Sequence, residues 1–145
     1  STQRAQEAGD QRWRELLDAH DAAARRLIGR EGGRWVKSTG DGVLAVFDGP
    51  GRAIRCALSL RTELRGIGIE IRAGLHTGEL DLLDDDVGGI AVHIGARIMA
   101  AAGPGEVLVS RTVRDLVVGS GIALEDRGTH ALKGLDEPWQ LFAAS

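Results

Sequence analysis

The sequence places a carboxylate and a lysine where they could contact a ligand. Asp41 stands between two glycines in a tight turn that joins two apolar stretches, and Lys37 precedes it by four residues. Glycines let a ligand approach the backbone closely, and a carboxylate at such a turn is a natural ligand for a hard metal ion. Asp-Gly is also favourable hairpin chemistry in itself, and a lysine at a strand end is ordinarily solvated. The residues of this turn alone leave both interpretations open.

A second group of candidate residues lies in a predicted helix. His93, Ala96 and Arg97 share one face of that helix, because they are three or four residues apart. The forked, permanently charged guanidinium of Arg97 suits a phosphoryl oxygen. The alternative is structural: Arg97 pairs with the aspartates at 84–86, and His93 is a half-exposed surface residue.

Hydrophobic periodicity and turn residues predict the elements that hold these candidates. Helices are expected at 13–28, from 49–50 onward, from 88–89 to about 102, and at 112–118, with Asp10 and Ser110 as N-caps of the first and last. Strands are expected at 34–37, 43–47, 69–73, 107–109, 122–125 and 139–143, with 80–83 extended and a turn at 84–86. The stretch 43–47 has no polar residue, which favours a central strand. This order predicts one α+β domain over residues 1–145, with a mixed sheet and helices packed on one face.

Composition excludes several classes of protein. The 145 residues are 43% apolar and 27% charged, which excludes a disordered chain. Aromatic residues make up only 3%, and the net charge is -3, so both base stacking and a nucleic-acid partner are disfavoured. No apolar stretch approaches the roughly 20 residues of a membrane span, so no direct membrane contact is expected. Cys56 is the only cysteine, which favours a reducing, cytoplasmic setting.

Four ordered blocks of sequence carry a resemblance to a known family. They are Val36–Gly42, Ala73–Gly78, Asp86 to Arg97, and Gly105–Ser110. Together they resemble a class III nucleotidyl cyclase catalytic domain, and their order and spacing are most similar to the mycobacterial type of adenylate cyclase. The resemblance covers nearly the whole chain. It implies a ferredoxin-like, palm-type mixed sheet and an enzyme that acts on a nucleoside triphosphate.

The resemblance assigns the base and metal contacts to four residues. It makes Asp41 one of two metal-binding aspartates, for a pair of Mg²⁺ or Mn²⁺ ions in each site. It makes Lys37 and Asp86 the pair that reads the edge of adenine, and it places Ala96 in the lining of the base pocket. Lys donates and Asp accepts hydrogen bonds at the edge of adenine, whereas guanine presents the reversed pattern. ATP is therefore the expected substrate.

The resemblance assigns the phosphate contacts to three further residues. Arg97 falls at the family's transition-state arginine, and Lys133, in Ala-Leu-Lys-Gly, falls at a lysine that binds the distal phosphates. His93 stands where many relatives have a transition-state asparagine. The implied reaction is in-line attack of the ribose 3′-oxygen on the α-phosphate, which yields 3′,5′-cyclic AMP and pyrophosphate.

The resemblance also implies a homodimer whose two sites are shared between subunits. Asp41 would come from one chain and Lys37, Asp86 and Arg97 from the other. The family's first metal aspartate lies in a strand ahead of a Gly-Ser-Thr, and Ser1-Thr2 resemble the end of that segment. The first strand is thus expected upstream of this sequence. The alternative is a catalytically degenerate cyclase-homology domain that binds a nucleotide or dimerises as a regulatory module.

Overall fold

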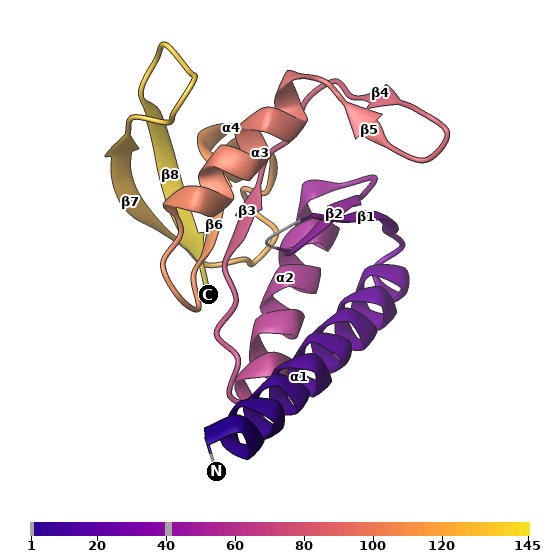
Figure 1. Ribbon diagram of the computed structural model, residues 1–145. Coiled ribbons are helices and arrows are strands. Elements are labelled where there is room, and N and C mark those ends of the chain that lie inside the picture. The colour runs from indigo at the N-terminus through magenta and orange to yellow at the C-terminus, as the bar shows by residue number, and fades with distance from the viewer. Residues whose placement is uncertain (1, 40–41) are drawn as a thin grey trace.

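The computed structural model describes residues 2–39 and 42–145, which form four helices and eight strands (Figure 1). The helices are α1 (Thr2–Arg30), α2 (Pro50–Arg65), α3 (Ile90–Ala101) and α4 (Arg111–Leu116). The strands are β1 (Arg34–Thr39), β2 (Gly42–Val46), β3 (Ala73–Leu75), β4 (Asp81–Leu82), β5 (Val87–Gly88), β6 (Val107–Ser110), β7 (Leu124–His130) and β8 (Trp139–Ala144). This mixed set of helices and strands confirms the predicted α+β class.

The largest sheet has four strands in the order β3-β6-β8-β7. β3 runs parallel to β6, whereas β8 pairs antiparallel with both β6 and β7. The strands expected at 122–125 and 139–143 correspond to β7 and β8, with β7 running from Leu124 to His130. Two further pairs, β1 with β2 and β4 with β5, are antiparallel hairpins. The β4–β5 hairpin projects from the body of the molecule (Figure 1).

Helices cover both faces of the large sheet, as the packing around strand β6 shows. Val107 and Val109 lie in one hydrophobic cluster with Ile54 of α2 and Val113 of α4. Leu108, which points to the opposite face, lies in a second cluster with residues of α3. Because successive side chains of a strand alternate between faces, an apolar strand needs cover on both. The expected packing of helices on one face is therefore corrected: α3 covers one face, and α2 and α4 cover the other.

Gly74 sets how closely α3 approaches the sheet. A Cβ atom at this position would lie 2.2 Å from the backbone nitrogen of Met99 and 2.6 Å from the carbonyl oxygen of Gly95. Both atoms belong to the backbone of α3, so no side-chain movement could relieve the contact. Only glycine allows α3 to lie this close to β3, and α3 is the helix that carries the candidates His93 and Arg97.

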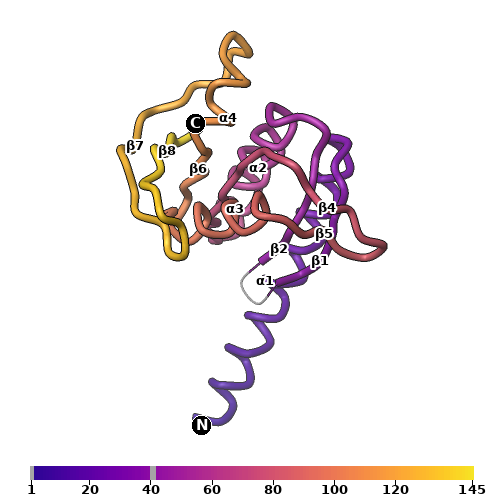
Figure 2. Tube along the Cα trace, turned by 90° about the horizontal axis from the view of Figure 1, so that it is seen from above, coloured from indigo at the N-terminus to yellow at the C-terminus, as the bar shows by residue number. Residues whose placement is uncertain are grey.

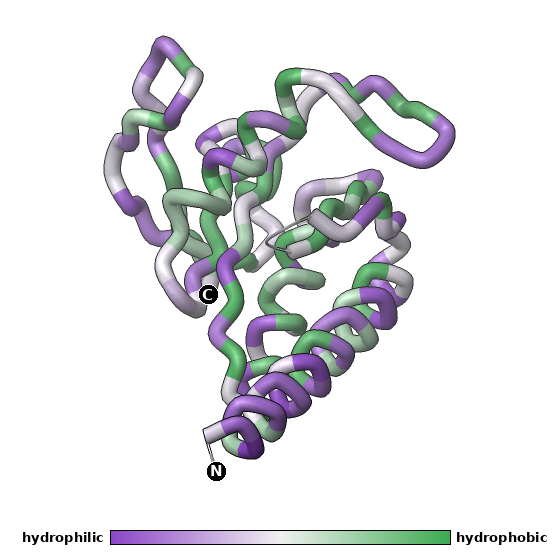
Figure 3. The backbone as a smooth tube through the Cα atoms, in the orientation of Figure 1, coloured by the Kyte–Doolittle hydropathy of each residue, from purple (hydrophilic) through white to green (hydrophobic). Residues whose placement is uncertain are grey.

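Helix α1 is longer than its periodicity predicts. Its buried residues are confined to the carboxyl-terminal part, where Ala24, Leu27 and Ile28 pack near Cys56. The amino-terminal part extends away from the rest of the molecule (Figure 2) and is strongly hydrophilic (Figure 3). Asp10, expected as the N-cap, lies inside this helix because the residues before it favour helix as well. No helix in the described part of the chain is long and apolar enough to cross a membrane.

One strand prediction was wrong in part. Of the expected strand 69–73, only Ala73 lies in a strand. The amide of Ile69 instead donates to the carbonyl of Leu64 at the end of α2, and the carbonyl of Ile71 accepts from the amide of Gly105, in the turn before β6. The stretch 43–47 forms β2, which among the described residues pairs with β1, and all residues of β2 are half-buried. Its Val43 and Ala45 pack toward α1 and α2, which accounts for their apolar character.

Candidate active site

Lys37 and Asp86 form a direct ion pair although 49 residues separate them. Lys37 Nζ donates to Asp86 Oδ2 over 2.8 Å, and the amide of Val87 donates to Asp86 Oδ1, also over 2.8 Å. Lys37 lies on β1, and Asp86 lies in the turn of the β4–β5 hairpin. A hydrogen bond from the Leu83 amide to the Asp86 carbonyl closes this turn. The side chains are 47% and 40% exposed, so both ends of the pair remain accessible to a ligand.

The hydrogen bond from Lys37 lowers the pKa of the Asp86 carboxyl below its ordinary value of 3.8, and the bond from Val87 lowers it further. Burial acts in the opposite direction without reversing this shift, and the Asp86 side chain remains 40% exposed. Asp86 is therefore ionised at neutral pH and can only accept hydrogen bonds, whereas the ammonium of Lys37 can only donate them. The pair presents one donor and one acceptor side by side.

Helix α3 presents His93 and Arg97 one turn apart, and both side chains are partly buried. The buried Arg97 Nε has no hydrogen-bond partner, and no described carboxylate lies within 4.0 Å of the guanidinium. The alternative in which Arg97 pairs with the aspartates at 84–86 is thus not observed, since Asp86 is held by Lys37. Ala96 is exposed beside Arg97.

The loop between β7 and β8 brings Lys133 toward the same helix. Leu132 is buried in the cluster that contains Ile94 of α3, so the loop is anchored on that helix. Gly134 has a φ of 83°, and a Cβ there would lie 3.2 Å from His93 Nε2. The backbone of the loop therefore passes directly beside the imidazole. Lys133 is exposed on this loop, next to the point of contact.

Asp41 lies outside the described residues. On either side of it, Thr39 and Gly42 are paired in the β1–β2 hairpin. Within residues 2–39 and 42–145, no group of three or more His, Cys, Asp or Glu side chains could hold a metal ion. Nor does a hydrogen bond or ion pair between described residues join the Lys37–Asp86 pair to His93 or Arg97.

A polar contact that the sequence did not single out joins the residue after β3 to the last residue of β6, which is also the N-cap of α4. His76 Nδ1 lies 2.7 Å from Ser110 Oγ, and the His76 ring meets Trp139 edge-on with centroids 5.3 Å apart. Ser110 is fully buried and caps α4 as expected, its Oγ accepting from the amide of Val113. Burial lowers the pKa of His76 below 6.5, so the imidazole is neutral at physiological pH. Only the Gly-Leu-His-Thr-Gly pattern around His76 marked this position in the sequence.

Comparison with known proteins finds relatives that are similar in sequence and solved structures that are similar in fold. No protein-family model matches the chain. An uncharacterised protein of Mycobacterium tuberculosis is 37% identical over 130 residues, which are 88% of this chain and 34% of that protein. A Rhizobium meliloti protein named "Putative adenylate cyclase 3" is 32% identical over 143 residues, which are 92% of this chain and 23% of that protein. The chain thus spans about a third or less of the length of these relatives.

Solved cyclase structures have the same fold. The "Adenylate/Guanylate Cyclase/Hydrolase" of Silicibacter pomeroyi is 28% identical with a TM-score of 0.76, and the match covers 90% of this chain and 85% of that one. The adenylyl cyclase CyaB of P. aeruginosa gives a TM-score of 0.77 at 24% identity, covering 90% and 81% of the two chains. An adenylate cyclase of Trypanosoma brucei gives 0.81 at 20% identity, covering 99% and 83%. The last two matches show the fold alone.

Proposed function

The chain belongs to the class III adenylate/guanylate cyclase domains, and from this premise we propose that it converts ATP to 3′,5′-cyclic AMP and pyrophosphate. The observation that carries the proposal is the contact between Lys37 and Asp86, two residues remote in sequence that the fold places 2.8 Å apart. A donor and an acceptor held side by side match the adenine edge, whose N1 accepts and whose amino group donates. Guanine offers the opposite arrangement, so the pair favours ATP over GTP.

In this proposal α3 and the β7–β8 loop hold the phosphates. Arg97 has no carboxylate partner among the described residues, so its guanidinium is available to the charge that develops on the phosphoryl oxygens. Lys133 extends from the loop that lies against His93, where an ammonium would bind the distal phosphates. His93 would donate a hydrogen bond near the reacting ribose and phosphate, and Ala96 leaves room beside Arg97 for the base.

We assign metal binding to Asp41, with an aspartate of the expected upstream strand as the second ligand. A carboxylate next to glycines fits a hard cation, since its oxygens are the donors that Mg²⁺ and Mn²⁺ prefer. A pair of such ions would lower the pKa of the 3′-hydroxyl and neutralise charge on the phosphates. The protein's own residues then align the 3′-oxygen with the α-phosphorus and stabilise the leaving pyrophosphate.

We further propose that two chains share each site. Leu82 and Leu83 are 69% and 55% exposed on the projecting β4–β5 hairpin, next to the turn that holds Asp86. Exposed leucines at the tip of a projecting hairpin are suited to contact with a second copy. In such a homodimer each site would contain Asp41 of one chain and Lys37, Asp86 and Arg97 of the other.

Formation of cyclic AMP from ATP in Mn²⁺ tests the activity. The assay is run on this chain and on a version extended upstream of Ser1, which also tests the expectation of a preceding strand. The control is Arg12→Ala, an exposed arginine on the projecting part of α1, which should leave turnover unchanged. If both versions bind nucleotide but form no cyclic AMP, the proposed cyclase activity is refuted and the degenerate regulatory module is favoured.

Mixing two inactive variants tests the shared site. Asp41→Ala and Arg97→Ala should each abolish turnover alone. When they are mixed, half of the dimers contain one variant of each kind, and one of their two sites is intact. The mixture should therefore recover about a quarter of the parent activity. If the mixture stays inactive while each variant still dimerises, the residues do not meet across subunits.

Base selectivity tests the Lys37–Asp86 pair separately. Lys37→Glu combined with Asp86→Ser removes both adenine contacts and supplies an acceptor for guanine. The ratio of kcat/KM for ATP to that for GTP should fall by about a hundredfold, because two charged hydrogen bonds are lost and each contributes roughly a factor of ten. An unchanged ratio would show that neither Lys37 nor Asp86 recognises the base.

A further inference from the structure

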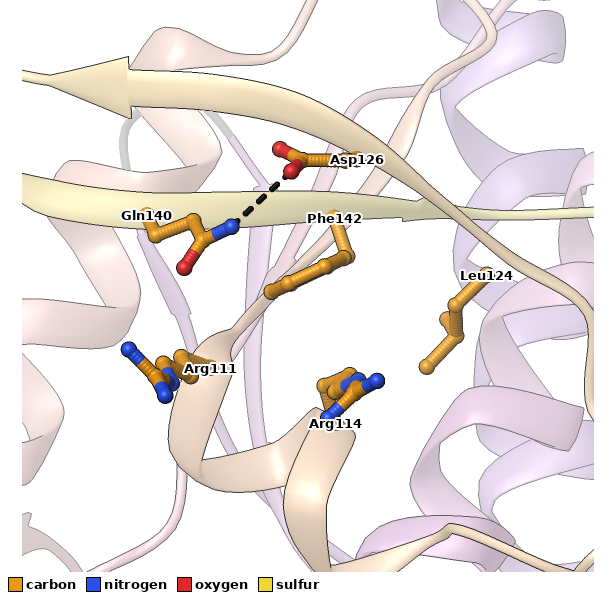
Figure 4. A pocket seen from close by; sticks show the side chains of 6 residues that line it. All are labelled: Arg111, Arg114, Leu124, Asp126, Gln140 and Phe142. Carbon is orange, nitrogen blue, oxygen red and sulfur yellow. Dashed lines mark hydrogen bonds between the residues drawn. The ribbon is translucent and has the colours of Figure 1, made fainter.

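Helix α4 and strands β7 and β8 line an open pocket of about 420 Å³ (Figure 4). It lies on the sheet face opposite α3, because Phe142 packs in the cluster with α4 whereas its neighbours Leu141 and Ala143 pack in the cluster with α3. The pocket is thus separate from the face that carries His93 and Arg97. Its lining is Arg111, Arg114, Leu124, Asp126, Gln140 and Phe142.

The lining combines apolar surface with two cations. Phe142 and Leu124 supply the apolar part, and Arg114 holds its guanidinium carbon 5.6 Å from the centre of the Phe142 ring. Arg111 lies three residues before Arg114, so both side chains leave the same face of α4. Arg111 lies opposite Gln140, and Arg114 lies on the side of Phe142 and Leu124 (Figure 4). An aromatic surface beside two guanidinium groups suits a flat ring that carries a negative charge.

The acidic residues at this site do not use up the arginine donors. Asp126 accepts hydrogen bonds from Gln140 Nε2 over 2.9 Å and from the amide of Gly128 over 2.7 Å, so its two oxygens are both engaged. Asp115 is 3.0 Å from Arg114 Nη1 and 4.0 Å from Arg111 Nε. One carboxylate thus faces two guanidinium groups, each of which has five N–H donors. The Arg111 side chain is 69% exposed, with only that long contact among the described residues.

From this arrangement we propose that the pocket binds an anionic ligand, a carboxylate or a phosphate, that carries a flat apolar ring. The anionic group would bind between Arg111 and Arg114, and the ring would lie against Phe142 and Leu124. The volume is within the range of small-molecule sites, which is about 300 to 1,000 Å³. The proposal does not depend on the cyclase activity, because none of these residues belongs to the proposed catalytic site.

Titration followed by ¹⁹F NMR tests this proposal on the whole chain. The probes are 4-fluorophenyl phosphate and 4-fluorobenzoate, which distinguish a phosphate from a carboxylate. Neutral 4-fluorobenzyl alcohol tests the need for charge, and inorganic phosphate, added as a competitor, tests the need for the ring. The variants are Arg111→Ala and Arg114→Ala, with Arg12→Ala as the control of equal charge, and circular dichroism verifies that each is folded.

Saturable binding of either charged probe is expected, and each pocket variant should weaken it by about tenfold, as loss of one charged hydrogen bond predicts. Arg12→Ala should bind like the parent. Absence of saturable binding by both charged probes at millimolar concentration would overturn the proposal. Equal binding of the neutral probe would overturn the role of the arginines, and displacement by an equal concentration of inorganic phosphate would overturn the role of the ring.

Discussion

Substitution of Gly74 by alanine tests how α3 is positioned. Gly74 is not among the glycines with positive φ, so its backbone is compatible with alanine and any cost comes from the new methyl group. That methyl would lie 2.2 Å from the backbone nitrogen and 2.7 Å from the Cα of Met99. Real Cβ atoms do not approach other heavy atoms so closely, so α3 must move away from β3.

This displacement of α3 lowers the free energy of unfolding. Overpacking of a core position costs about 1 to 3 kcal/mol, and a contact with helix backbone belongs at the upper end, about 3 kcal/mol. For a chain of 145 residues this corresponds to a fall in Tm of about 12 °C, at about 4 °C per kcal/mol. Thermal unfolding followed by circular dichroism at 222 nm measures the shift.

Gly95→Ala is the matched control, because it adds the same methyl group to α3 itself. A Cβ at Gly95 meets no atom within 4 Å, so the only effect is the better helix propensity of alanine. Gly95→Ala should raise the free energy of unfolding by about 1 kcal/mol, opposite in sign to Gly74→Ala. If Gly74→Ala lowered Tm by less than about 4 °C, the described separation of α3 and β3 would be wrong.

The remaining predictions concern single side chains. Lys37→Ala should raise the pKa of Asp86 toward 3.8, since it removes the main cause of the depression; NMR titration of the carboxyl measures this, and an unmoved pKa would contradict the ion pair. Burial raises the pKa of Cys56 to about 11, so the native thiol should not react with a disulfide reagent at pH 8 and should react at once in denaturant. Ser110→Ala should cost about 2 kcal/mol, because it removes the cap of α4 and leaves His76 without its partner; urea unfolding measures the loss. His76 binds a proton more readily in the unfolded chain, so stability should rise with pH from its lowered pKa up to about 6.5, and His76→Gln should flatten that rise.

Local patterns predicted most helices and their ends. The helix expected from 88–89 to about 102 is observed as α3, because its apolar residues recur at helical spacing and Gly103-Pro104-Gly105 stops it. Ser110 was expected to start the last helix and caps α4. Such features depend on neighbours in the sequence, which is why they can be predicted from it.

Features that depend on distant parts of the chain were harder to predict. β3 is short because its partner β6 begins only at Val107, and no pattern within 69–73 contains that information. The Lys37–Asp86 contact joins strand β1 to the turn of the β4–β5 hairpin, 49 residues away, so it was expected only through the resemblance to a family and not from spacing. The pocket beside Phe142 likewise depends on how β7, β8 and α4 pack, and no motif marked it.

The covering of β6 on both faces has a consequence for the dynamics of the molecule. All four residues of this strand are buried, and the strand is hydrogen-bonded to a neighbour on each side, β3 and β8. Exchange of its amide hydrogens with solvent therefore requires the whole sheet to open. The amides of Leu108 and Val109 should exchange only through global unfolding, and the free energy derived from their protection should equal the one measured in denaturant. The exposed first turns of α1 should exchange many orders of magnitude faster, so one chain would display both extremes of local stability.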